Sequence, residues 1–424
     1  MFTENATLIS EIRERFAHVD SCPFQGQRIF FENAGGALTL KSVVETSAFY
    51  AAIPDNPGRQ NPAGQRTQKV INKAKNDLGL LMNATSGQFF VGESGTELLF
   101  RMIRTACLAA PKHSKVIGSS IEHPASRSAA RRWAKITEMD YINVVHDNAT
   151  GMVTAEDYSA LMTPDVAVAT ILHASPVTGI GMDVKEIVIA IRSVSPNCYI
   201  IVDGIQHAAH GQIDLQAYNV DGYAISPYKM FSRHGYGIAW ISERLAKTPH
   251  DKLIDAPITS WEFGTRDTGS YATISDIVSY FEWLGSKISQ ETDRRSLIKA
   301  AGEAIHSYET SLTDCLINGT GNLRGLRELD GITILAGDDN PKREGLISIV
   351  IKGRKSEDIV EELNVQGIRT HTRKADYYSG NVLSPLNQTD CVRISLCHYN
   401  TEAEIRKLLT ALAEIVKVKS SVQL

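Results

Sequence analysis

Two residues that can do chemistry each stand at the end of an apolar stretch. Asp203 follows the run Tyr-Ile-Ile-Val, and Lys229 lies between the apolar residues 222–225 and the pair Met230-Phe231. A lysine that is desolvated near other cations has a lowered pKa and can form an imine with an aldehyde. A buried carboxylate can keep a pyridinium nitrogen protonated, which makes the ring an electron sink. For Asp203 alone a turn-forming Asp-Gly pair is the simpler interpretation, and a lone lysine is usually a solvated surface residue.

Two further clusters suit an anion and a flat ring. In the segment 92–97, Gly-Glu-Ser-Gly-Thr-Glu, a helix that begins near Gly95 and Thr96 offers backbone N–H groups to a phosphate. The alternative is an ordinary N-cap at Ser94. His123, in the sequence Ile-Glu-His-Pro, is either a satisfied core histidine or a ring that stacks on a cofactor. In the company of the other clusters, the stacking interpretation is preferred.

An alternating pattern between residues 85 and 245 predicts the sheet that would bring these clusters together. Apolar, β-branched strands are predicted at residues 88–91, 115–117, 166–172, 199–202, 222–225 and 238–241, with amphipathic helices such as 96–109 and 184–193 between them. This alternation is typical of a mostly parallel sheet covered by helices on both faces. Ligands of such sheets bind beyond the carboxyl ends of the strands, where all four clusters are placed.

The pattern changes near residue 290. A charged helix at 291–312 precedes a strand at 345–351, a helix at 356–363 and a strand around 392–396. The last helix opens at Thr401, with Glu404 at the spacing of a capping box. We therefore predict a large α/β domain over residues 31–288. Residues 1–30 and 289–424 are predicted to form a smaller α+β domain.

Composition indicates a cytoplasmic globular protein. The 424 residues are 43% hydrophobic and carry 44 basic and 48 acidic side chains, a net charge of −4, so no nucleic-acid partner is expected. The N-terminus lacks the long apolar core of a signal peptide, and no apolar run reaches the roughly 18 residues of a membrane helix. Six cysteines without a CxxC pair indicate free thiols in a reducing compartment and no metal site.

The motifs together resemble the class V aminotransferase and cysteine desulfurase family of pyridoxal 5'-phosphate (PLP)-dependent enzymes. The resemblance runs from Phe-Glu-Asn-Ala-Gly-Gly at 31–36 to Val-Arg-Ile-Ser-Leu-Cys-His-Tyr-Asn at 392–400. It implies an α/β fold of type I, that of the aspartate aminotransferase-like PLP-dependent transferases. In that fold a large, mostly parallel seven-stranded sheet is joined to a smaller α+β domain.

The resemblance assigns cofactor roles by position. Lys229 holds PLP as a Schiff base and moves a proton between the substrate Cα and the cofactor C4′, Asp203 pairs with the pyridine nitrogen, and His123 stacks on the ring. Gln206 lies near the ring hydroxyl. The phosphate is held by Gly95, Thr96, Ser226 and Tyr228. Thr265, in the segment Trp-Glu-Phe-Gly-Thr, reaches the phosphate of a neighbouring subunit, which implies a homodimer with shared active sites.

The resemblance also implies an α-amino acid substrate, processed through an external aldimine and a quinonoid. Arg393 matches the arginine that binds the α-carboxylate, and a guanidinium fits a planar carboxylate in a bidentate way. The alternative is a surface arginine on an edge strand. The other candidates for substrate binding are Asn33, Arg369, His371 and Arg373.

The sequence departs from the family pattern at several points. Tyr228 stands where desulfurases usually have histidine, and Thr178-Gly179 resembles the aminotransferases of the class. The predicted loop at 367–380, which carries the nucleophilic cysteine of desulfurases, has none here. Because Cys391 and Cys397 lie in or beside a predicted strand, we expect no persulfide chemistry. The loop is basic instead, which favours either a substrate with a second anionic or polar group or a solvated loop.

Several functions remain open from the sequence. Transamination, β-elimination by a C–S or C–Se lyase, and epimerisation all begin with the same quinonoid, so the sequence does not separate them. A non-catalytic fold-type I regulator is a further alternative, although intact Lys229, Asp203 and Arg393 argue against it. A nucleotide-binding oxidoreductase is disfavoured because no G-x-G-x-x-G follows the first strand.

Overall fold

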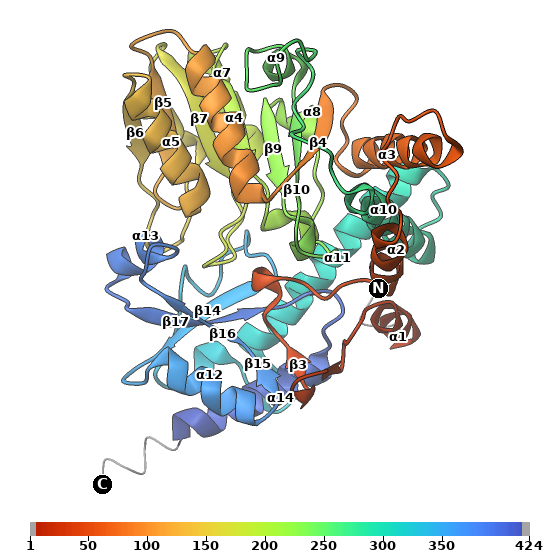
Figure 1. Ribbon diagram of the computed structural model, residues 1–424. Helices are drawn as coiled ribbons and strands as arrows, with labels where there is room; N and C mark the ends of the chain where they lie inside the picture. Colours follow the sequence, from red (N-terminus) through yellow and green to blue (C-terminus); the bar gives the residue numbers. More distant parts are fainter. Residues whose placement is uncertain (1–5, 418–424) are drawn as a thin grey trace.

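A seven-stranded sheet forms the upper half of the computed structural model, which describes residues 6–417 (Figure 1). Its spatial order is β4-β10-β9-β8-β7-β5-β6. The strands are β4 (Gln88–Gly92), β5 (Lys115–Ser119), β6 (Asp140–Val144), β7 (Val166–Leu172), β8 (Tyr199–Asp203), β9 (Gly222–Ile225) and β10 (Gly237–Ile241). Five neighbours, from β9 to β6, are parallel, and β10 runs antiparallel to both β9 and β4. The predicted mostly parallel seven-stranded sheet is therefore confirmed.

The central strands read as apolar runs because helices cover both faces of this sheet. On one face, α4 (Gly95–Ala109) and α5 (Pro124–Ile136) share a core with alternate strand residues such as Val116, Val168 and Ile201. On the other face, α7 (Val184–Val194) packs in a core that contains Ile200 and Val202. Strand β6 was not among the predicted strands. It is an edge strand, Asp-Tyr-Ile-Asn-Val, whose side chains range from an exposed Asp140 to a buried Val144, so neither an apolar run nor a regular alternation marks it.

A four-stranded antiparallel sheet lies below the large one in Figure 1. Its order is β13 (Ile332–Ile334), β14 (Leu346–Ile351), β17 (Asp390–Ser395) and β16 (His371–Lys374). Helices α11 (Arg294–Asn318), α12 (Ser356–Val365) and α14 (Glu402–Lys417) belong to this half, and α11 also packs on α10 (Thr268–Ile288). The N-terminal part of the chain is tied to it, because β3 (Ile29–Phe30) pairs in parallel with β15 (Ile368–Arg369). The domain boundaries at 30/31 and 288/289 stay predictions.

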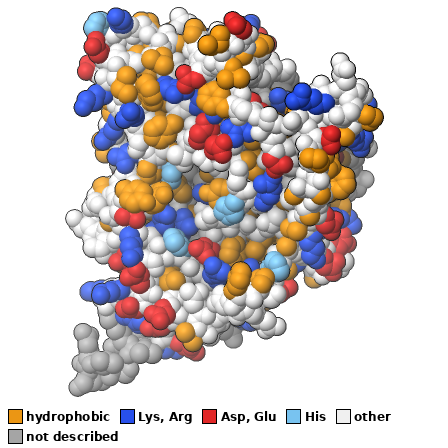
Figure 2. Space-filling view, in the orientation of Figure 1, with side chains coloured by type: hydrophobic (Ala, Val, Ile, Leu, Met, Phe, Trp, Pro, Cys, Tyr) orange, Lys and Arg blue, Asp and Glu red, His pale blue; other side chains and the backbone are white. Residues whose placement is uncertain are grey.

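The segment 367–380 is not the loop that the sequence suggested. It contains β15 and β16, because β3 and β17 supply the backbone partners that short polar strands need. The remaining helices that bear on the argument are α1 (Ala6–Glu14), α2 (Lys41–Ala51) and α3 (Pro62–Leu81), the last two packed on α10. None of the described helices has the length and apolarity to cross a membrane. Figure 2 shows histidine side chains reaching the surface across the middle of this face, between the two sheets.

Candidate active site

A cavity lies beyond the carboxyl ends of five strands of the large sheet. The residues that follow β4, β5, β7, β8 and β9 all contribute to its wall. They are Ser94, Gly95, Thr96, His123, Leu172, Ala174, Pro176, Asp203, Ile205, Gln206, Ser226, Tyr228 and Lys229. Eight of the nine residues that the resemblance assigns to the cofactor are in this set. The exception is Thr265.

Lys229 lines the cavity from the short 3-10 turn Pro227–Lys229, which follows β9. Its ammonium Nζ donates to Gln206 Oε1 at 3.3 Å. Burial, together with the nearby Arg393 and Arg373 charges, lowers the pKa of Lys229 to about 7, although the Asp203 charge opposes the shift. A large share of this amine is therefore uncharged at neutral pH, as a nucleophile must be.

Asp203 ends β8, beside Ala224 of β9, and its carboxylate is buried. Burial raises the pKa of Asp203 to about 6, while the Ile205 N–H, at 3.1 Å from Oδ1, and the Lys229 charge oppose this. Asp203 is thus more than a turn residue: it is a carboxylate that needs a cationic partner in the cavity to stay ionised at low cost.

The N-terminus of α4 forms another wall. Ser94 caps the helix by accepting from the Glu97 N–H at 3.1 Å, so the N-cap interpretation is correct. The cap does not use the N–H groups of Gly95 and Thr96, the first two residues of the helix, and both residues line the cavity. Glycine at position 95 leaves room for its neighbours, because a Cβ there would stand 2.4 Å from Ile205 Cδ1 and 2.6 Å from Ser226 Oγ, so both side chains would have to shift. The cap and the anion site are therefore compatible features of one helix start.

His123 is the residue before α5, and its Nδ1 accepts from the Ala125 N–H at 3.1 Å. Burial lowers the pKa of His123 to about 4, helped by the charges of Lys229 and Arg373. The imidazole is neutral at physiological pH, with Nε2 carrying the proton. A neutral ring at the cavity wall can lie on another ring without electrostatic repulsion.

A buried polar chain, which the sequence did not reveal, leads away from Lys229. The Gln206 amide Nε2 lies 3.3 Å from His210 Nε2, and His210 Nδ1 lies 2.7 Å from Glu309 Oε2 on α11. In the tautomer that satisfies both contacts, Gln206 donates to His210 and His210 donates to Glu309. Burial disfavours the His210 cation, but the Glu309 carboxylate raises the pKa of His210 overall.

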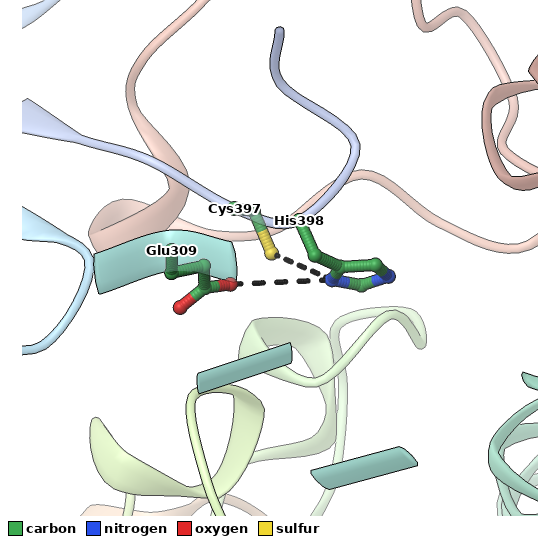
Figure 3. Close-up of side chains that lie close together, drawn as sticks. All are labelled: Glu309, Cys397 and His398. Carbon is green, nitrogen blue, oxygen red and sulfur yellow. Dashed lines mark hydrogen bonds and ion pairs between the residues drawn. The ribbon is translucent and has the colours of Figure 1, made fainter. Parts of the chain in front are cut away.

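The chain ends at the cluster drawn in Figure 3. His398 Nδ1 lies 3.5 Å from Cys397 Sγ and 4.0 Å from Glu309 Oε1, and His398 Nε2 lies 2.5 Å from the Tyr280 hydroxyl. Glu309, Cys397 and His398 are of metal-binding types, and one ligand atom of each lies within 4.8 Å of the others. His398 contacts Cys397 and Tyr280, and Glu309 Oε2 contacts His210, whereas Glu309 Oε1 is buried without a hydrogen-bond partner among the described residues. The cluster is therefore a hydrogen-bonded core with one unpaired carboxylate oxygen.

Arg393 lies on β17, buried, on the face of the small sheet that meets the cavity. Its Nη1 donates to Pro176 O at 3.0 Å, and Pro176 lines the cavity. Its Nε is buried without a hydrogen-bond partner among the described residues. Burial lowers the pKa of Arg393 to about 10, which leaves the guanidinium charged. The surface-arginine alternative is therefore wrong.

The remaining predicted substrate residues do not share one environment. Arg369 Nε lies 3.0 Å from Glu32 Oε2, and His371 Nδ1 lies 3.3 Å from Glu32 Oε1. Burial would raise the pKa of Glu32, but His371 and Arg369 bring it below its usual value. Only Arg373 is left without such a partner, and its Nε donates to Ser379 Oγ at 2.8 Å.

Asn33 and Thr265 do not line the cavity. The Asn33 amide donates to Ser395 O at 2.7 Å and accepts from the Tyr399 hydroxyl, which gives Asn33 a place in the core beside β17. Thr265 is exposed, next to Arg266, which pairs with Glu93. Neither residue belongs to the set that lines the cavity of its own chain.

The profile of the family described as Aminotransferase class-V matches residues 29–408. The chain is 24% identical to the cysteine desulfurase-like protein ustD of Aspergillus flavus over 97% of its own length and 92% of that protein's. It is also 24% identical to a probable cysteine desulfurase of Xylella fastidiosa, over 92% of its own length and 91% of that protein's. Among solved structures, the cysteine desulfurase of Thermococcus onnurineus aligns with a TM-score of 0.80 at 18% identity, over 96% of this chain and 98% of that one. The cysteine desulfurase CsdA of Escherichia coli aligns with a TM-score of 0.78 at 21% identity, over 97% of this chain and 98% of that one.

The fold and the cavity thus define a fold-type I PLP-dependent enzyme. The chain belongs to the class V aminotransferase family.

Proposed function

We propose that this enzyme binds PLP through Lys229 and acts on an α-amino acid. The observation that carries the proposal is the pairing of a partly buried amine, Lys229, with a buried carboxylate, Asp203, at the ends of the neighbouring strands β9 and β8 in one cavity. The pKa of each is shifted toward the neutral form. Strongly shifted titratable groups in a cavity are typical of active sites.

The cavity walls fit PLP group by group. The α4 N-terminus at Gly95 and Thr96, with Ser226 and Tyr228, would hold the phosphate, since backbone N–H groups and hydroxyls there converge on an anion. Asp203 would face the pyridine nitrogen, His123 the ring face and Gln206 the ring hydroxyl. The bound cofactor supplies an aldehyde for Lys229 and a ring that withdraws electrons from the substrate Cα.

The residues of the chain then have separate tasks. Lys229, with its lowered pKa, can accept a proton at Nζ from the substrate Cα and return it elsewhere. Arg393 would bind the α-carboxylate, and its unpartnered Nε would provide a further donor for it. Fixing the carboxylate orients the Cα–H bond for cleavage. Transamination, β-elimination and epimerisation all require this proton transfer and this binding of the carboxylate.

Storage of sulfur as a persulfide is not part of the proposed function. The segment 367–380 has no cysteine. Cys391 and Cys397 are fully buried, and burial raises the pKa of Cys391 to about 11 and that of Cys397 well above its usual value. A thiol attacks as its thiolate, which such burial disfavours.

A homodimer with shared sites is the proposed assembly. Thr265 is exposed and does not line the cavity of its own chain, and the preceding segment exposes large apolar side chains: Leu253, Ile254, Ile258 and Phe263. Such a group is typical of a surface that packs against another chain. The partner's Thr265 would then complete the phosphate site.

Reduction of the purified protein with borohydride tests the proposal directly. We expect a visible-edge absorbance band with PLP, lost on reduction, and a cofactor adduct on the peptide that contains Lys229. Lys229→Ala should abolish the adduct, whereas Lys247→Ala, an exposed lysine after α9 (Glu243–Ala246), should not. An adduct on another lysine would contradict the assignment of Lys229, and the absence of any adduct would contradict the proposal and favour a non-catalytic regulator.

A further inference from the structure

We infer that the substrate carries a second anionic group on a short side chain and that Arg373 binds it. The inference rests on the proposed function and adds the substrate class: an α-amino acid with a side-chain carboxylate or an isosteric anion such as a sulfinate.

The argument begins with which basic residues of the segment 367–380 are already neutralised. Arg369 and His371 share the Glu32 carboxylate. Lys374 Nζ lies 2.5 Å from Glu357 Oε1, on the surface. No carboxylate oxygen of the described residues lies within ion-pair distance of Arg373. Its partner is a hydroxyl, that of Ser379.

The strand register places Arg373 on the cavity side of the small sheet. His371 is directly opposite Arg393, and Arg373 is opposite Cys391, so all four residues share one face of the β16–β17 pair. Arg373 and Arg393 are therefore diagonal neighbours, which lie about 7–8 Å apart in an antiparallel pair. Such spacing suits the two anionic ends of a short molecule.

The surroundings of Arg373 agree with this placement. Its guanidinium lies 5.8 Å from the ring centre of Tyr378, and that ring lies 6.1 Å from His123, a cavity wall residue. The Arg373 charge is close enough to lower the pKa of His123, Lys229 and Arg393. Burial lowers the pKa of Arg373 itself, so this is not a freely solvated side chain.

Two guanidinium groups without carboxylate partners therefore stand on one face beside the cavity. A desolvated charge without a partner is costly, and a ligand that neutralises it recovers that cost on binding. One α-carboxylate would neutralise Arg393 only. A second anion on the same ligand would neutralise Arg373 as well.

Binding of unreactive anions to the PLP-loaded enzyme tests the inference without turnover. Succinate and butyrate have the same carbon count and no amine, so they probe the two arginines alone. We expect succinate to bind about tenfold or more tightly than butyrate by calorimetry, since a charged hydrogen bond is worth at least a tenfold change. Arg373→Ala should bring succinate to the butyrate value and leave butyrate unchanged, and Arg373→Lys should keep part of the preference.

Lys374→Ala is the matched control, because it removes a neighbouring cation on the opposite face of β16 that already has a partner. Equal affinity for the two acids in the wild-type enzyme would overturn the inference, and so would a preference that survives Arg373→Ala. A Lys229 adduct that forms normally in such an enzyme leaves the proposed function standing. Failure to form that adduct would overturn the proposed function itself. Higher kcat/KM for aspartate than for asparagine or alanine would support a carboxylate; the same preference for cysteine sulfinate alone would support the sulfinate.

Discussion

At the residue scale, burial sets the chemistry of the cavity. Lys229 and Asp203 are ordinary in sequence, but desolvation moves their pKa values toward each other, to about 7 and about 6. In low-dielectric surroundings each charge depends on the other for stabilisation. The amine is poised to react with an aldehyde, and the carboxylate is poised to accept a cationic partner.

The pH dependence of cofactor binding follows from the lowered pKa of Lys229. Since the uncharged amine attacks the aldehyde, the rate of PLP association with the apoenzyme should rise with pH through about 7 and level off above it. With a lysine of the usual pKa, about 10.4, the association rate would keep rising up to about pH 10. Asp203→Asn removes a charge that raises the pKa of Lys229. The midpoint of the rate–pH curve should therefore lie at a lower pH in this variant. Stopped-flow absorbance across this range measures both, and a rate still climbing at pH 9 would contradict the assignment.

The cysteines give a second prediction at this scale. After incubation of the holoenzyme with cysteine, intact-mass and peptide mass spectrometry should find no persulfide on Cys391 or Cys397, even where sulfide is released. Cys22 is the matched comparison. A hydrogen bond from the Phe24 backbone lowers the pKa of the Cys22 thiol, and the Cys22 side chain is partly exposed. Thiol reagents should therefore modify Cys22 well before Cys391 and Cys397. A stoichiometric persulfide on either buried cysteine would overturn the expectation.

At the element scale, helix α11 of the small-sheet half supports a residue of the large-sheet half. Glu309 on α11 holds His210, and His210 holds the Gln206 amide that contacts Lys229. The contacts of His210 with Gln206 and with Glu309 are buried, and leaving one of these groups unpaired costs about 1–3 kcal/mol. The position of Gln206 thus depends on how α11 packs.

Glu309→Gln tests this dependence. Because the carboxylate raises the pKa of His210, its loss should lower that pKa and loosen Gln206. We expect a loss of about 1–3 kcal/mol in the free energy of unfolding and a shifted pH titration of the cofactor absorbance band. Glu303→Gln, an exposed carboxylate on the same helix, should change neither. A destabilised variant whose cofactor titration is unchanged would show that Glu309 serves packing alone.

At the scale of the whole molecule, the proposed active site is complete only if a second chain supplies Thr265. A subunit with Lys229→Ala cannot anchor PLP, and one with Thr265→Ala should hold its partner's phosphate poorly. Mixing the two should produce hybrids with one intact site, so PLP binding of wild-type affinity should reappear at one site per dimer. Equilibrium dialysis measures this stoichiometry. A monomer in sedimentation that binds PLP with full affinity would rule the shared site out.

The sequence by itself determined the family, the sheet and the cavity residues. Lys229, Asp203 and His123 could be found because each follows a strand, and in a parallel sheet all such positions meet at one edge. The same local logic located Gly95 at a helix start. It failed for β6, whose edge position leaves it with little apolar periodicity, and for β16, which is polar and depends on its partner β17.

Only the tertiary structure decided which charges are free. Glu32 neutralises Arg369 and His371 from the other end of the chain, and His210 contacts Glu309, which is 99 residues away in the sequence. No local pattern marks such pairs, because an ion pair or a buried hydrogen bond depends on distance and burial in space. For the same reason the sequence predicted only a basic loop. In the folded chain, Arg373 is the one guanidinium among the described residues of that segment that has no carboxylate partner, and it lies beside the cavity.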